Sequence, residues 1–217
     1  MYSIDRKTGL LTPGDAIPSG DYPVSVCVHP NGRFLYAANA DSDNISAYRI
    51  NRATGALAEA LPRAAAGDTP YTVAVDPTGR FAYAANANSD NISAYSIDQE
   101  TGALTEVLPR AAAGEAPYSV TVDPSGRFVY SSNRDSCTVS VFEINLLTGG
   151  LTASGTITGR SGPLAMAMVK GAAPVRYLPG FLYVTETDSG SVTVYSIDES
   201  SGSLTFETAY AMEFDPK

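Results

Sequence analysis

The stretch VDPTGRFAYAAN, residues 75–86, decides how this chain folds. It returns as VHPNGRFLYAAN at 28–39 and as VDPSGRFVYSSN at 122–133, so that the three prolines stand 47 residues apart. A fixed period of this length is the signature of a protein built from stacked supersecondary units. The fold can therefore be worked out from one copy of the repeat.

The repeat extends well beyond this motif. Residues 39–67 and 86–114 differ at only seven of 29 positions, and the segment LPRAAAG recurs intact at 61–67 and 108–114. A more diverged fourth copy, FLYVTETDSGSVTVYSIDESSGSL, occupies 181–204. A longer segment replaces the DPxGR turn in this last copy, which accounts for its later position in the chain.

Each copy predicts four short strands separated by turns. In the second copy the strands are expected at 71–75, 81–86, 91–97 and 103–108, because these segments alternate or are rich in aromatic residues. The turns are DPTGR, where proline presets φ and glycine adopts a positive φ, then ANSD and DQETG. The segment RAAAG favours a helix but is too short to form one, and proline and glycine flank it.

Four antiparallel strands in about 47 residues, repeated in tandem, are typical of a β-propeller blade. A sandwich does not usually repeat its sequence, and a parallel β-helix has shorter rungs. A blade packs both of its faces on neighbouring blades, which explains apolar residues at both strand parities, as in Val73, Ala74 and Val75. The predicted fold is an all-β propeller of about four full blades plus a half-blade at the N-terminus.

The first residues, MYSIDRKTGLL at 1–11, match the third and fourth strands of a blade. We expect one domain over 1–217, divided into a half-blade at 1–22, blades at 23–69, 70–116, 117–162 and 163–210, and a tail at 211–217.

A propeller ring must close, since an open blade face leaves apolar residues in water. The tail TFETAYAMEFDPK at 205–217 ends in FDP, so it either supplies the first strand of a fifth blade or finishes the fourth. Neither arrangement completes a ring. We therefore expect self-association, in which two chains pool blades or swap terminal strands.

Composition limits the classes of partner. The net charge is −9 and the pI is about 4.5, which argues against nucleic acid or an anionic membrane. No apolar stretch of about 18 residues is present, and the N-terminus lacks a signal pattern, which favours the cytoplasm. Cys27 and Cys137 fall at different positions of the repeat and are expected to be reduced.

The block HPNGRFLYAANADSDNISAYRINRATGAL at 29–57 resembles the repeat of the seven-bladed propeller lactonases. That family includes propeller-type 6-phosphogluconolactonases and fungal carboxymuconate cyclases. The segment LYVTETDSGSVTVYSID at 182–198 is similar to the YVTN-type repeats of surface-layer propellers. The resemblance implies a propeller fold and hydrolysis of a small lactone.

In a propeller, the linker into a blade and the loop between its second and third strands share one face, which usually holds the ligand at the channel mouth. Here we call it the ligand face. The residues expected to bind ligand there are Asn39, Asn86, Asn133, Tyr71 and Tyr118. The asparagines also suit a structural role, because asparagine caps turns.

The candidate catalytic residues are polar residues of the ligand face at positions where the other copies of the repeat have a different residue. Arg134 replaces Ala40 and Ala87, Glu186 replaces the asparagine of the other copies, and Arg160 lies in the linker to the fourth blade. The arginines would hold an anionic substrate and the developing oxyanion, and Glu186 would activate water as a general base.

The remaining signals exclude other chemistries. The single histidine, His29, replaces the aspartate of the DP turn and is expected to serve that turn first and catalysis second. One histidine and two separated cysteines predict no zinc site, and no cofactor is expected. The resemblance to the propeller lactonases, together with Arg134, Arg160 and Glu186, implies a hydrolase of a small sugar or organic-acid lactone. The alternatives are a non-catalytic binding or assembly scaffold, and a propeller fragment that folds by oligomerising.

Overall fold

The structure is a computed structural model that describes residues 2–159, 161–170 and 179–212. All its secondary-structure elements are strands, and they form four four-stranded antiparallel sheets and one two-stranded sheet. Blade 1 consists of β3 (Pro23–Val28), β4 (Phe34–Asn39), β5 (Asn44–Ile50) and β6 (Leu57–Ala65). Blade 2 consists of β7 (Pro70–Val75), β8 (Phe81–Asn86), β9 (Asn91–Ile97) and β10 (Leu104–Ala112).

The other sheets follow in chain order. Blade 3 consists of β11 (Pro117–Val122), β12 (Phe128–Asn133), β13 (Thr138–Ile144) and β14 (Leu151–Thr158). Blade 4 consists of β15 (Pro163–Lys170), β16 (Pro179–Glu186), β17 (Ser191–Ile197) and β18 (Leu204–Ala211). The N-terminal residues form a separate hairpin of β1 (Tyr2–Ile4) and β2 (Leu11–Pro13).

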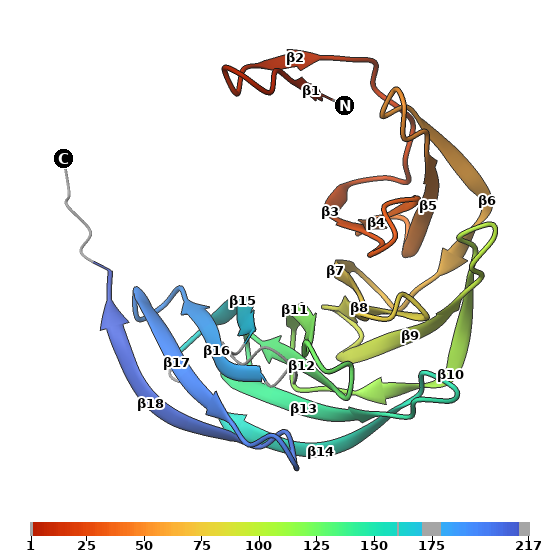
Figure 1. The fold of residues 1–217 in the computed structure, drawn as a ribbon. Coiled ribbons are helices and arrows are strands. Elements are labelled where there is room, and N and C mark those ends of the chain that lie inside the picture. Colours follow the sequence, from red (N-terminus) through yellow and green to blue (C-terminus); the bar gives the residue numbers. More distant parts are fainter. Residues whose placement is uncertain (1, 160, 171–178, 213–217) are drawn as a thin grey trace.

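The four blades are arranged as an arc (Figure 1). The first strand of each blade, β3, β7, β11 or β15, lies on the inner side of the arc, and the fourth lies on the outer side. This arrangement confirms the predicted fold class, an all-β propeller of four-stranded antiparallel blades.

The fourth strand is longer than predicted. In blade 2 it was expected to end at Leu108, but β10 continues to Ala112. A register shift between Val107 and Ala111 lets the strand resume pairing with β9, with Ala111 opposite Ile92 and Ala112 opposite Asn91. The segment that resembled a short helix former is thus extended, because it completes the outer edge of the sheet.

At the C-terminal end, residues 205–211 belong to β18 and finish blade 4. They therefore do not supply a strand to a fifth blade. The FDP segment at 214–216 lies outside the described residues.

The recurring motif DPxGRFxY builds a tight turn between the first two strands. In blade 2, Asp76 Oδ2 accepts a hydrogen bond from the Thr78 N–H (2.9 Å), and Asp76 Oδ1 accepts one from the Phe81 N–H (2.8 Å). Gly79 has a φ of 74°, a conformation that glycine adopts without strain. Asp76 is buried, so these hydrogen bonds supply the polar partners that its carboxylate needs.

The residues after this turn join each blade to the next, in a contact set that we call the interblade latch. From blade 2, the Tyr83 hydroxyl donates to the Gly149 carbonyl of blade 3 (3.1 Å), and Arg80 Nη1 donates to the Leu146 carbonyl (3.1 Å). The Phe81 ring lies directly against Gly149, where a Cβ would overlap it. The same tyrosine-to-glycine bond joins blade 1 to blade 2 and blade 3 to blade 4.

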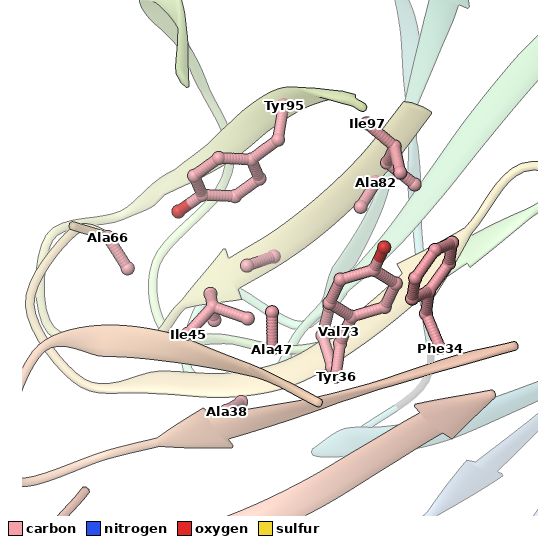
Figure 2. Close-up of a cluster of buried hydrophobic side chains, with 11 residues drawn as sticks. Phe34, Tyr36, Ala38, Ile45, Ala47, Ala66, Val73, Ala82, Tyr95 and Ile97 are labelled. Atoms are coloured by element: carbon pink, nitrogen blue, oxygen red, sulfur yellow. The ribbon is translucent and has the colours of Figure 1, made fainter. Parts of the chain in front are cut away.

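Hydrophobic clusters fill the spaces between blades, and Figure 2 shows the one between blades 1 and 2. We call the face that a blade turns to the next blade its leading face, and the opposite face its trailing face. The leading face of blade 1 contributes Phe34, Tyr36, Ala38, Ile45 and Ala47. The trailing face of blade 2 contributes Val73, Ala82, Tyr95 and Ile97.

Replacing Tyr83 with phenylalanine is expected to reduce the free energy of unfolding by about 1–2 kcal/mol, because the Gly149 carbonyl loses its donor in a buried place. Chemical denaturation monitored by circular dichroism measures the change. Tyr2→Phe is the matched control, since Tyr2 is 65% exposed and should be replaceable without effect. Equal stability of the two variants would show that the latch hydrogen bond contributes nothing.

Candidate functional site

The strand register places the predicted ligand face at one edge of every blade. In blade 2, Pro70 at the start of β7 pairs with Asn86 at the end of β8, and Asn86 pairs with Asn91 at the start of β9. Asn91 in turn pairs with Ala112 at the end of β10. The linker into a blade and its second turn therefore share this edge.

The recurrent asparagines lie inside the edge of the blade. Asn86 is fully buried, and its Nδ2 donates to Asn91 Oδ1 (2.8 Å) and Ser93 Oγ (3.0 Å). The linker residue Gly67 lies directly over it, because a Cβ on Gly67 would be 2.7 Å from Asn86 Cγ. Asn39 and Asn133 are buried in the same way. These contacts join the second strand to the third beneath the linker, and ligand binding by the asparagines stays a prediction.

The aspartates of the same loops hold neighbouring blades together. Asp43 Oδ1 accepts a hydrogen bond from the Thr69 N–H, and Asp90 Oδ1 accepts one from the Ala116 N–H, both at 2.8 Å. Each bond runs from the loop of one blade to the linker that enters the next. The sequence alone does not reveal these bonds, because a contact 26 residues away depends on how the blades pack.

Glu186 is a fully buried carboxylate at the position of the asparagines. Its Oε2 accepts hydrogen bonds from Ser189 Oγ (3.2 Å) and Ser191 Oγ (3.4 Å). The two hydroxyls lie 2.7 Å apart, and Ser189 is exposed at the surface. A chain of hydroxyl groups therefore leads from the solvent to the carboxylate. Arg160, the third predicted catalytic residue, lies outside the described residues.

Ser189 departs from its repeat equivalents in what it contacts. Ser42, Ser89 and Ser136 each accept a hydrogen bond from the linker that enters their blade. Ser189 instead donates to Glu186. This serine could not be predicted from the sequence, because the residue itself is unchanged between copies. Only its new neighbour, Glu186, gives it a different role.

Three predicted residues come together at the inner rim of the ligand face. The Tyr71 and Tyr118 rings, from neighbouring first strands β7 and β11, have centroids 4.4 Å apart and are tilted by 57°. The Arg134 guanidinium carbon lies 5.7 Å from the centroid of Tyr118, a cation–π arrangement. We call these residues the rim cluster: a paired aromatic surface with a guanidinium beside it.

The charge of Arg134 is only lightly paired. Its side chain is 42% exposed, and its Nη1 lies 3.6 Å from Asp135 Oδ1, whose side chain is 59% exposed. Exposed pairs of this kind bind weakly, so an anionic group on a ligand can compete for the guanidinium. The rim cluster can therefore stack an apolar ring face on the tyrosines and hold a negative charge beside it.

His29 lies at the opposite edge of blade 1, in the turn between β3 and β4. It is buried, its Nδ1 accepts from the Asn31 N–H (3.1 Å), and its Nε2 lies 2.7 Å from the Gly79 carbonyl. Because Nδ1 accepts, we infer that Nε2 carries the proton and donates to Gly79. These contacts agree with the predicted role in the turn.

Two further findings concern the described residues only. No three or more His, Cys, Asp or Glu side chains among them are grouped so that they could hold a metal ion. Nor does any described segment form a helix of the length and apolarity needed to span a membrane.

The family model for lactonases with a seven-bladed β-propeller matches residues 1–75 and 58–168. No curated protein sequence matches the chain.

Solved structures share the fold at low sequence identity. A proposed 6-phosphogluconolactonase of Bacteroides uniformis is similar with a TM-score of 0.85 at 20% identity, over 98% of this chain and 64% of that one. A second, from Bacteroides fragilis, gives 0.82 at 22% identity, over 98% and 64%. A periplasmic gluconolactonase of Pseudomonas aeruginosa gives 0.77 at 20%, over 96% and 62%. The chain thus spans less than two thirds of the length of these structures.

Proposed function

The chain belongs to the family of seven-bladed β-propeller lactonases, and on that premise we propose that it hydrolyses a small sugar or organic-acid lactone at the ligand face. The observation that carries the proposal is the rim cluster of Tyr71, Tyr118 and Arg134, because it joins a stacking surface to a guanidinium at the channel mouth.

The substrate ring would stack on the two tyrosines. A lactone ring presents C–H groups on its faces, and these pack well on aromatic rings. Arg134 would then bind a carboxylate or phosphate of the substrate, or the carbonyl oxygen on which negative charge develops. Arg160, in the linker to blade 4, is proposed to assist Arg134 in this role.

Glu186 would act as the general base. It is buried, so we propose that the proton reaches it through Ser189, whose hydroxyl donates to Glu186 Oε2. Water attacks the lactone carbonyl and gives its proton to Ser189 Oγ, while the Ser189 proton passes to Glu186. The C–O bond of the ring then breaks, and Glu186 returns the proton through Ser189 to the ring oxygen, which gives the hydroxy acid and restores both side chains.

The experiment follows acid release from δ-lactones, with and without a phosphate group, above the spontaneous rate. Replacing Glu186 with glutamine is expected to lower kcat/KM about a hundredfold or more through kcat, because the base is lost. Ser189→Ala should lower kcat with KM unchanged. The matched control is Ser89→Ala, which removes the equivalent hydroxyl from blade 2, where it only holds a linker.

Arg134→Met tests the binding role separately. It should raise KM for the phosphorylated lactone about tenfold or more and leave KM for the neutral lactone nearly unchanged, because only the former offers an anion to the guanidinium. The proposed activity would be overturned if the protein produced no rate above the spontaneous one on any of the lactones. A rate that Glu186→Gln leaves intact would overturn the role given to Glu186.

A further inference from the structure

The inner part of the trailing face of blade 1 is open, whereas its outer part is covered by residues 15–19, where Tyr48 is 4% exposed and its hydroxyl donates to the Pro18 carbonyl (2.9 Å). Val26 on this face is 66% exposed, whereas its repeat equivalents Val73 and Val120 are each 5% exposed against the preceding blade. A hollow of about 380 Å³ lies over the face, lined by Val26, Leu35, Ala37, Ile50 and Leu57 among others. The equivalents of these residues in blades 2 to 4 are interblade contacts, apart from Ser131, the counterpart of Ala37 in blade 3.

The leading face of blade 4 is open as well. Phe181 is 44% exposed, whereas Phe34, Phe81 and Phe128 are at most 5% exposed between blades. The other residues at the equivalent positions of this face are Tyr183, Thr185, Val192 and Val194. In Figure 1 this blade stands at the far end of the arc from blade 1.

The two open faces are complementary. At each interblade contact, a phenylalanine and a tyrosine of the leading face meet a glycine with positive φ on the next blade. The open trailing face offers the equivalent glycine, Gly55, with a φ of 75° at the edge of the hollow. The open leading face offers Phe181 and Tyr183.

We propose that the trailing face of blade 1 binds the leading face of blade 4 of a second copy of this chain. Phe181 of the second copy would pack against Gly55, and its Tyr183 hydroxyl would donate to the Gly55 carbonyl. The contact would continue a packing arrangement that the chain already makes three times. It is head to tail, since two different surfaces meet.

The β1–β2 hairpin lies beside this face at the outer side of the arc. An incoming blade has to displace it. The hairpin has two strands of three residues, all exposed, and a two-stranded sheet without packing is marginal in water. Displacement of the hairpin itself therefore costs little, and displacement of the adjoining residues 15–19 also breaks the hydrogen bond from Tyr48 to the Pro18 carbonyl.

Two charge substitutions, each on an exposed side chain, test the contact by sedimentation velocity between about 1 and 100 µM. The wild-type chain should form species above 22.7 kDa as its concentration rises. Val26→Asp damages only the trailing face, and Phe181→Asp only the leading face, so each variant alone should associate at least about tenfold more weakly. Leu147→Asp is the control, because Leu147 is 85% exposed and lies on neither face.

Mixing the two variants is the decisive measurement. Phe181→Asp keeps an intact trailing face and Val26→Asp an intact leading face, so a head-to-tail contact predicts a one-to-one complex in the mixture alone. Circular dichroism spectra matching the wild type confirm that both variants fold. A wild-type chain that stays at 22.7 kDa, variants that associate like the wild type, or a mixture that does not associate would each overturn the proposal. None of these readouts depends on lactone hydrolysis.

Discussion

Replacement of Gly149 with alanine is expected to reduce the free energy of unfolding by about 2–5 kcal/mol. Gly149 has a φ of 80°, which costs other residues about 1–2 kcal/mol. A Cβ there would also overlap the Phe81 ring of blade 2, and displacement of a packed ring costs a further 1–3 kcal/mol or so. Urea denaturation monitored by circular dichroism measures the loss.

Gly9→Ala is the control for backbone strain alone. Gly9 has a similar φ of 73°, but a Cβ there would meet no atom within 4 Å. The control should cost about 1–2 kcal/mol at most, confined to the β1–β2 hairpin. If both variants lose the same stability, the close packing of the phenylalanine on the glycine contributes nothing to the contact between blades.

A second large effect is expected in alkali. Burial raises the pKa of Tyr36, Tyr83, Tyr95 and Tyr130 well above the ordinary value of 10.0. In the unfolded chain these hydroxyls ionise near pH 10, so folding keeps them protonated. Their contribution to stability is therefore complete below about pH 10 and is lost as the pH rises towards their folded values. Above about pH 10, four such groups together lower the free energy of unfolding by about 5 kcal/mol per pH unit.

The protein should therefore unfold cooperatively between about pH 10 and 12. Tyrosinate absorbance should show these four side chains ionising together with the loss of the circular dichroism signal. In Tyr83→Phe, the slope of unfolding free energy against pH should fall by about 1.4 kcal/mol per pH unit. Ionisation of all 13 tyrosines near pH 10 with the sheet signal intact would contradict the expectation.

The blades could be predicted because their determinants are local. The DPxGRFxY turn contains its own aspartate, its positive-φ glycine and the aromatic residues that follow, so one copy specifies the start of a blade. The extension of β10 to Ala112 was not predicted, because a strand that shifts register and then resumes pairing does not show a regular alternation of apolar and polar residues in the sequence.

The candidate site was predicted only in part. Comparing copies selected Arg134 and Glu186, since both break the repeat. The approach of Tyr71 to Tyr118 and the serine chain that leads to Glu186 depend on the packing of blades and linkers. The burial of Glu186 likewise comes from its position beside the linker at Gly159, which its own sequence context does not reveal.

The interblade latch has a consequence for how such a chain can change its length. Each of blades 1 to 3 carries both halves of the latch: the arginine, phenylalanine and tyrosine that reach forward, and the glycine hairpin that can receive those of a preceding blade. Duplication or loss of a 47-residue unit among blades 1 to 3 therefore leaves every new junction matched. Recombination between near-identical copies can add or remove whole blades without a compensating mutation.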